Sequence, residues 1–147
     1  MVSYDIVMES RKKRLILLSC TMEDHQFNIH GRGHKTMTDQ ELYQLWCKKA
    51  VEDPKVAAEL KQIKGNDQEI RDRFYADLEF GTAGLRGLLG AGTIRMNVYT
   101  VRRATQGYAA YLLENFENPS VAIAYDSRHQ SDEFARETAA VFAANGV

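Results

Sequence analysis

Cysteine is scarce in this chain, and so are the features that mark membrane and nucleic-acid-binding proteins. Cys20 and Cys47 are the only two cysteines among 147 residues, which is too few for a disulfide framework and fits a reducing compartment. The longest early apolar run, residues 15–18, is much shorter than a membrane span or the core of a signal peptide. The formal net charge is −1, from 19 basic and 20 acidic residues, so no basic surplus favours nucleic acid. We therefore expect a cytoplasmic protein without membrane or nucleic-acid partners.

Several catalytic signatures are also missing. No Gly-Lys-Ser/Thr follows the glycine-rich stretch near the middle of the chain, which excludes a P-loop. The spacing Gly84-x-x-Gly87-x-x-Gly90 differs from a dinucleotide fingerprint. Ser127 lies near His129, but neighbours around one loop do not make a catalytic triad, which needs an oriented third group. No Asp-x-Asp cluster offers carboxylates to Mg²⁺.

The first 36 residues show no helical or strand period, and we interpret residues 1–37 as an unstructured leader. The residues Cys20, His25, His30 and His34 could in principle bind zinc, but their spacing lacks the tight Cys-x-x-Cys pair of such sites. We therefore predict no metal site. Because an unordered segment buries too little to offset its conformational entropy, deleting the leader should leave the thermal midpoint nearly unchanged.

Residues 38–78 are predicted to form a helical arm. The tetrapeptide 38–41, with Thr first and Glu last, has the form of a capping box and starts a helix that ends near residue 52. Asp53-Pro54 starts a second helix, because Asp is a good N-cap and Pro suits the first helical position. Gly65 ends that helix, and a third begins at residue 66 or 67. The arm is amphipathic, so we expect it to dock on the rest of the chain.

Five of the ten glycines fall between Gly81 and Gly92. Glycine lets the backbone approach a ligand closely, and this stretch also holds Thr82 and Arg86. Backbone N–H groups, a hydroxyl and a planar cation together suit an anion. The pattern predicts a glycine-rich hairpin with Arg86 at its tip. A hairpin whose Arg86 is paired internally is the equally good alternative.

Beyond the glycines the pattern alternates between helix and strand. Residues 93–96 are predicted to end a strand, and Asn97 to cap a helix of about five turns. Residues 120–125 form a continuous apolar run, typical of a strand covered on both faces. Ser131 is predicted to cap a last helix, which Asn145-Gly146 ends. This order is typical of βαβ units in a doubly wound parallel sheet, with the final Val as the first residue of a further strand, so we expect a truncated α/β fold.

The segment Asp126-Ser127-Arg128 follows the predicted strand at its carboxyl end, where ligands bind in open α/β sheets. Asp126 could hold Arg128 by a charge-assisted hydrogen bond and leave the guanidinium facing a phosphate. The alternative is a plain turn in which Asp126 caps the loop and Arg128 is solvated. The residues alone favour the plain turn.

One motif carries a resemblance. The stretch Phe80-Gly-Thr-Ala-Gly-Leu-Arg-Gly87, followed by Gly-Ala-Gly-Thr-Ile-Arg-Met-Asn at residues 90–97, closely resembles the amino-terminal domain of the α-D-phosphohexomutases. The form of the motif is most similar to the phosphoglucomutase and phosphopentomutase branch. Residues 121–128 and 134–146 resemble the next strand and helix of that domain, and the helical arm is similar to the lead-in of the branch. The resemblance covers residues 38–147 and does not reach the leader.

The resemblance implies domains of 38–78 for the arm and 79–147 for the amino-terminal part of a three-layer α/β/α domain I with a mixed sheet. It also implies an isomerase of carbohydrate metabolism that moves phosphate between C1 and C6 of a hexose, or between C1 and C5 of a pentose. A phosphoserine donates its phosphoryl group, a sugar bisphosphate is both intermediate and activator, and Mg²⁺ held by an Asp-x-Asp-x-Asp loop offsets the developing charge.

Residue roles follow from the same resemblance. The Arg of the Gly-Leu-Arg motif lies near the phosphoserine in the family, so Arg86 inherits a phosphate-proximal place, beside the bend residues Thr82, Gly84 and Gly87. Arg128 is a weaker carry-over at the rim. The Thr-Ala-Ser-His-Asn-Pro loop of the phosphoserine and the metal loop do not occur in the 147 residues, so we expect the chain alone to be inactive and to contain no catalytic or metal-binding residue. A non-catalytic α/β module that binds phosphate or a protein partner is the alternative, and neither the sugar nor the oligomeric state follows from the sequence.

Overall fold

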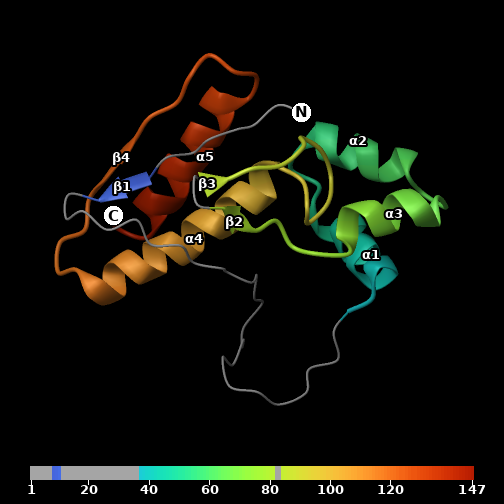
Figure 1. Ribbon diagram of the computed structural model, residues 1–147, viewed down its shortest axis with the longest axis horizontal. Coiled ribbons are helices and arrows are strands. Elements are labelled where there is room, and N and C mark those ends of the chain that lie inside the picture. The colour runs from blue at the N-terminus through green and yellow to red at the C-terminus, as the bar shows by residue number, and fades with distance from the viewer. Residues whose placement is uncertain (1–7, 11–36, 82–83) are drawn as a thin grey trace.

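The computed structural model describes residues 8–10, 37–81 and 84–147. Its helices form two groups, one of α1 (Asp39–Lys49), α2 (Pro54–Gln62) and α3 (Asp67–Phe74), the other of α4 (Val98–Asn115) and α5 (Ser131–Ala144). Figure 1 shows the groups at opposite ends of the molecule, with the backbone that joins α3 to α4 between them. None of the described helices is both long enough and apolar enough to span a membrane.

The helical arm begins its helices where the caps predict. The Thr38 hydroxyl accepts from Glu41 N at 3.3 Å while a Glu41 carboxylate oxygen accepts from Thr38 N at 2.8 Å, so both halves of the capping box are present. Asp53 caps α2 by accepting from Lys55 N at 2.8 Å. The Asn66 side chain accepts from Glu69 N at the start of α3. The three predicted caps are therefore confirmed. They are predictable because a cap needs only partners two or three residues away in the chain.

The three arm helices enclose a core of their own. Phe74 of α3 meets two rings of α1 edge-on, Tyr43 at a centroid distance of 6.0 Å and Trp46 at 5.6 Å, a geometry that the quadrupoles of aromatic rings favour. Leu60 and Ile70, which are 2% and 1% exposed, pack in the same cluster. Ala91 of the glycine-rich segment also belongs to it. The arm therefore packs directly on the segment that carries the candidate site.

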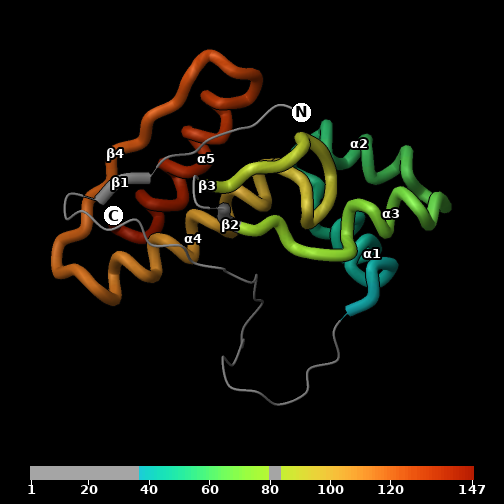
Figure 2. The backbone as a smooth tube through the Cα atoms, viewed as in Figure 1, coloured from blue at the N-terminus to red at the C-terminus, as the bar shows by residue number. Residues whose placement is uncertain are grey.

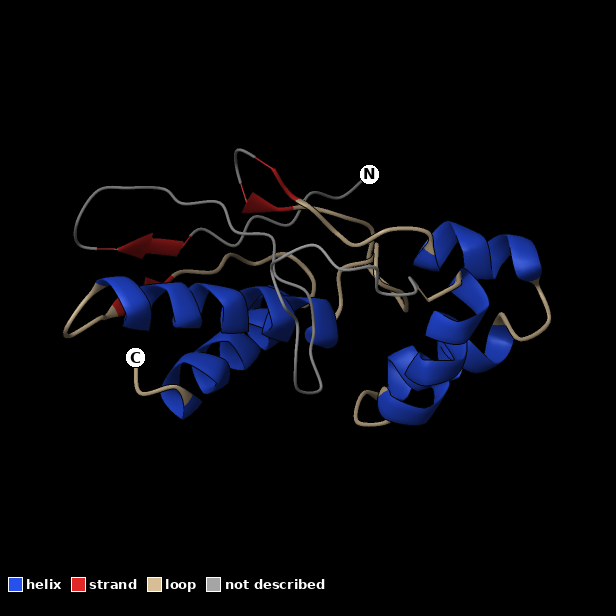
Figure 3. Ribbon diagram, turned by 90° about the horizontal axis from the view of Figure 1, so that it is seen from below, coloured by secondary structure: helices blue, strands red, loops and turns tan. Residues whose placement is uncertain are grey.

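The second group of helices is held by two apolar clusters. Asn97 caps α4, whose length matches the predicted helix of about five turns. Phe134 of α5, 1% exposed, packs with residues of α4 and with Leu85. Further along, Phe142 packs with α4 and with the half-buried Val121 and Ile123. The helices thus form one layer that covers one side of the strands, as Figure 3 shows from below.

The strands are short and pair differently from the sequence prediction. β1 (Met8–Ser10) pairs antiparallel with β4 (Val121–Ile123), and β2 (Phe80–Gly81) pairs antiparallel with β3 (Gly84–Leu85). The doubly wound parallel sheet is therefore not observed among the described residues, where β4 has β1 as its neighbour. A three-residue strand carries no detectable period, which is why the sequence does not predict β1 within residues 1–37. The division into leader, arm and domain stays a prediction.

Three local predictions are corrected. Residues 93–96 form turns, and only Met96 makes a strand-like bridge, to Leu89. Gln130 rather than Ser131 stands at the N-cap of α5, with a φ of 64° and no side-chain capping bond, because the Ser131 hydroxyl instead accepts from Asp126 N at 3.3 Å. The residues of β4 are not covered on both faces, since Ala122 is exposed.

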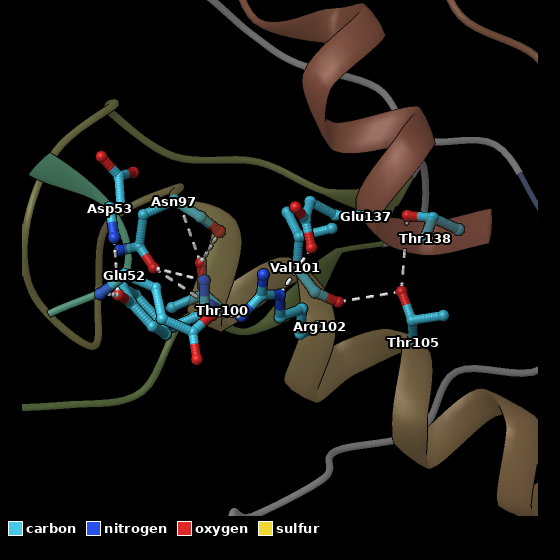
Figure 4. A network of polar contacts seen from close by, with 10 residues as sticks. Glu52, Asp53, Asn97, Thr100, Val101, Arg102, Thr105, Glu137 and Thr138 are labelled. Atoms are coloured by element: carbon cyan, nitrogen blue, oxygen red, sulfur yellow. Dashed lines mark hydrogen bonds and ion pairs between the residues drawn. The ribbon is translucent and has the colours of Figure 1, made fainter. Parts of the chain in front are cut away.

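Polar contacts join the arm to the α4–α5 pair. The Arg102 guanidinium donates to Glu137 of α5 at 2.5 Å and to Glu52, just after α1, at 2.7 Å, as Figure 4 shows. The hydrogen bonds to Glu137 and Glu52 raise the pKa of Arg102 above its already high value, so the cation persists at any working pH. The Tyr99 hydroxyl of α4 accepts from both Glu52 N and Asp53 N at 3.0 Å. Both contacts hold the turn between α1 and α2 against α4.

Candidate functional site

Arg86 follows a two-stranded hairpin at an exposed position. Gly81 pairs with Gly84 and Phe80 with Leu85, so Arg86 lies just beyond β3 and not at the tip, which corrects the prediction. Thr82, the hydroxyl expected beside it, lies outside the described residues. Leu85, only 3% exposed, packs in one cluster with residues of α4 and α5. The residue before Arg86 is thus fixed in the core, while Arg86 itself faces outward.

The backbone after Arg86 folds against the residues that precede α4. Met96 N donates to Leu88 O at 2.7 Å and Gly90 N donates to Met96 O at 3.1 Å, which is the pattern of a short parallel pairing. A Cβ at Gly87 would stand 2.8 Å from Leu78 Cδ1 and 3.4 Å from Ile94 O. Gly87 therefore permits a close approach of two backbone segments. Figure 2 shows this doubled-back path between α3 and α4.

Asn97 holds the doubled-back segment together. Its Oδ1 caps α4 by accepting from Tyr99 N and Thr100 N, at 3.1 and 3.0 Å. Its Nδ2 group donates to three carbonyl oxygens, Gly90 O at 2.8 Å, Gly92 O at 3.1 Å and Arg95 O at 3.2 Å. The residue is almost fully buried, at 4% exposed. One amide therefore starts the helix and closes the loop in front of it, and the sequence predicted only the first of these roles.

The helical arm clamps the same loop from the other side. Glu59 of α2 accepts from Ala91 N at 2.9 Å and from Arg73 Nη1 of α3 at 2.8 Å. Arg73 also donates to Glu69 at 3.0 Å and to Ala91 O at 3.3 Å. The Thr93 hydroxyl donates to Ala76 O at 2.7 Å. Sequence analysis missed this clamp because Glu59 lies 14 residues from Arg73 and 32 residues from Ala91, and no local pattern joins them.

We expect Glu59→Gln to weaken the clamp without abolishing the fold. Gln keeps one acceptor oxygen but loses the charge that Arg73 and Ala91 N share, which should cost about 1–2 kcal/mol of unfolding free energy. Amide hydrogen exchange measures this locally, with faster exchange at Ala91 than in the wild type. Glu79→Gln serves as the control, because Glu79 is exposed. Unchanged exchange at Ala91 would contradict the clamp.

The turn after β4 forms the contact that the sequence suggested. Arg128 Nε donates to Asp126 Oδ2 at 2.7 Å, and Arg128 N donates to Asp126 Oδ1 at 2.9 Å. These bonds, the backbone one first, lower the pKa of Asp126, so the carboxylate is ionised at neutral pH. Arg128 is therefore oriented by Asp126, and its side chain remains 32% exposed. A fully solvated Arg128, the alternative, is not what the structure shows.

The hairpin and this turn are both anchored at the start of α5. Leu85 shares a core cluster with Phe134, in the first turn of that helix, and Ser131 accepts from Asp126 N. Gly84, Arg86 and Gly87 lie within a few residues of Leu85. Arg86 and Arg128 thus each lie in a segment that contacts the first turn of α5, while the phosphate-proximal roles assigned to them stay predictions.

The described residues do not form a metal centre. They contain no cluster of three or more His, Cys, Asp or Glu side chains that could hold an ion. This part of the chain therefore does not fit Mg²⁺. The four residues weighed as zinc ligands, Cys20, His25, His30 and His34, lie outside the described residues.

Known proteins resemble this chain in sequence. Residues 77–147 match the family described as phosphoglucomutase/phosphomannomutase, alpha/beta/alpha domain I. A probable phosphoribomutase of Schizosaccharomyces pombe is 42% identical over 112 residues, which is 73% of this chain and 19% of that protein. Phosphopentomutase of Mus musculus is 38% identical over 128 residues, 80% of this chain and 20% of the relative. Phosphoglucomutase of Staphylococcus aureus (strain bovine RF122 / ET3-1) is 42% identical over 100 residues, 68% and 18% of the two chains.

These matches cover only a part of each relative. The chain spans about a fifth of the length of these curated relatives. No solved structure matches the chain. The match to domain I contains the hairpin, Asn97 and the turn after β4, whereas most of the arm precedes it. The relatives of 112 and 128 matched residues extend into the arm, because those lengths exceed the 71 residues from 77 to 147.

Proposed function

Because residues 77–147 match domain I of the phosphoglucomutase/phosphomannomutase family, we propose that this chain supplies a phosphoryl-binding part of a sugar phosphate mutase. The observation that carries the proposal is the setting of Arg86. The residue is exposed and directly follows the buried Leu85, and it precedes by a few residues the backbone of Gly90 and Ala91, which Asn97 and Glu59 hold in place. A cation fixed in this way meets an anion without a large loss of conformational freedom.

The reaction proposed is an intramolecular phosphoryl transfer that interconverts a sugar 1-phosphate with a 6- or 5-phosphate through a phosphoserine and a sugar bisphosphate. Arg86 contributes a planar guanidinium that can donate to two phosphoryl oxygens at once. Gly87 keeps the backbone close to Ile94 and so sets the direction of the preceding residue. Arg128, oriented by Asp126, adds positive charge at the rim.

Two parts of that reaction are not assigned to the residues of this chain. The family uses Mg²⁺, which offsets negative charge on the transferring phosphoryl group, but the described residues offer no site for it. The Ser-His-Asn-Pro motif of the phosphoserine does not occur in the 147 residues. The role proposed for this chain is therefore binding and orientation of phosphate.

The 147-residue chain by itself should show no mutase turnover. Without a phosphoserine there is no donor for the first transfer, so glucose 1-phosphate should remain unchanged even with Mg²⁺ and glucose 1,6-bisphosphate. A coupled assay for glucose 6-phosphate, read against a buffer blank, measures this. Turnover above the blank that scales with the amount of chain would show that the phosphoryl donor has been misassigned.

Binding tests the role of Arg86 directly. Arg86→Gln should weaken glucose 1,6-bisphosphate by roughly 10- to 100-fold, because a charged hydrogen bond contributes about 1.5–3 kcal/mol. Arg86→Lys keeps the charge but loses the bidentate geometry, so its affinity should fall between the two. Isothermal titration calorimetry measures the dissociation constants, with Arg71→Gln as a control because Arg71 is exposed on α3. Equal affinity of Arg86→Gln and the wild type would remove the basis of the proposal.

A further inference from the structure

A second arginine near the hairpin has an unusual environment. Arg95 Nε is buried and has no hydrogen-bond partner, the only such side-chain nitrogen or oxygen atom in the part of the chain that the structure describes. The backbone of Arg95 is, by contrast, fully used. Its N–H donates to Gly92 O at 3.3 Å, and its carbonyl oxygen accepts from Thr100 Oγ1 at 2.9 Å and from Asn97 Nδ2 at 3.2 Å. Its backbone is therefore held while its Nε–H is unsatisfied.

An unsatisfied buried donor on a charged group opposes folding more than a neutral one does. Buried polar atoms in native proteins nearly always have partners, and an exception calls for an explanation such as an ion or a functional role. No ion pair of Arg95 is found within residues 8–10, 37–81 and 84–147. The unsatisfied Nε–H lowers the stability of the fold, yet hydrogen bonds with Gly92, Asn97 and Thr100 fix the backbone of Arg95 in this place. A ligand that accepts from Nε–H would explain this arrangement.

The local pairing sets Arg95 beside the segment that follows Arg86. The parallel bridge pairs Leu89 with Met96, and Met96 N donates to Leu88 O at 2.7 Å, so the turn that carries Arg95 lies next to Leu88, two residues after Arg86. Arg86 and Leu88 are exposed and Arg95 is partly buried, whereas Leu85 and Met96 are 3% and 0% exposed.

We propose that Arg95 is a second phosphoryl-binding residue, which donates its Nε–H to an oxygen of the same phosphate monoester that Arg86 contacts. A phosphate monoester carries close to two negative charges at neutral pH, so it suits two guanidinium groups better than a single carboxylate does. The inference deepens the proposed function and rests on it for the identity of the ligand. It needs no residue beyond those described.

The side-chain Nε–Hε resonances of arginine test this without any substitution. The full chain is labelled with ¹⁵N and titrated with inorganic phosphate and, separately, with glucose 1,6-bisphosphate. The Arg95 resonance should shift along a saturable curve with either probe, because each supplies phosphoryl oxygens. The Arg71 resonance, from the exposed face of α3, should stay in place. An Arg95 resonance that does not move at saturation overturns the inference.

Variants give the size of the effect. Arg95→Gln should weaken glucose 1,6-bisphosphate about 10-fold or more, and Arg95→Lys should weaken it less, while Arg71→Gln should leave the affinity unchanged. Removing an unsatisfied buried donor of a charged group should also leave the thermal midpoint of Arg95→Gln equal to or above that of the wild type. A lower midpoint together with unchanged affinity would show that Arg95 is structural, and the inference would be wrong.

The two proposals fail in different ways. Movement of the Arg86 resonance alone supports the proposed function and overturns the role of Arg95. Movement of the Arg95 resonance alone supports an anion site at Arg95 and removes the proposed function of Arg86. If neither resonance moves, both are overturned.

Discussion

Gly92→Ala is expected to destabilise the chain by about 3 kcal/mol or more. A Cβ at this position would stand 2.5 Å from Arg73 O and 2.8 Å from Arg73 Cβ, distances at which the backbone of α3 itself must move. The φ of Gly92 is +127°, a conformation that side chains rarely adopt. The steric clash and the backbone strain therefore add, and we expect the loop around Gly92 to move away from α3.

The control for this prediction is Gly65→Ala. Gly65 has a positive φ of +80°, but nothing lies within 4 Å of an added Cβ. It therefore measures conformational strain alone, about 1 kcal/mol. Urea denaturation of the two variants gives the difference. If both lose the same stability, the loop does not sit against Arg73 as described.

Asn97 is expected to be the residue whose side chain contributes most to the same loop. Asn97→Ala removes the cap of α4 and leaves the carbonyls of Gly90, Gly92 and Arg95 without their common donor. A lost cap costs about 1 kcal/mol and buried carbonyls without partners about 1–3 kcal/mol more, so we expect a loss of roughly 2–4 kcal/mol. Urea denaturation again measures the change.

Asn97→Asp separates the two roles of the side chain. Asp is as good a cap as Asn, but it replaces the Nδ2 donor with an oxygen that faces three carbonyl oxygens. We therefore expect Asn97→Asp to be at least as destabilising as Asn97→Ala. Asn66→Asp is the matched control, because Asn66 caps the exposed start of α3 and should tolerate the change. A near-neutral Asn97→Asp would show that capping is the only role.

The sequence predicted what depends on neighbours in the chain. The helix caps are as expected, because each capping side chain bonds to a backbone N–H no more than three residues away. They are Thr38, Asp53, Asn66 and Asn97. The glycine-rich motif also indicated the family whose domain I residues 77–147 match, because its residues are contiguous in the chain. The contact of Arg128 with Asp126 is one of the two arrangements that the sequence allowed, for the same reason.

What the sequence could not predict depends on distant partners. The clamp of Glu59 and Arg73 on Ala91 joins three elements, and the pairing of Leu89 with Met96 forms only after the loop closes. The place of Arg86 beyond β3 depends on the pairing register of Gly81 with Gly84. The sequence does not determine this register, because glycine has no side chain that must face the core. The type of residue at Ser131 favours a cap, yet its hydroxyl accepts from a backbone N–H of the turn after β4.

The central claim is that the hairpin and the turn after β4 bind one phosphate-bearing ligand. Titration of the ¹⁵N-labelled chain with glucose 1,6-bisphosphate, followed by backbone amide shifts, tests it most directly. We predict that the amides of Leu85, Arg86, Gly87 and Arg128 shift together along one curve with a single dissociation constant. Shifts confined to the exposed lysines of the arm, such as Lys48 and Lys61, with residues 84–87 and 126–128 unmoved, would contradict the claim.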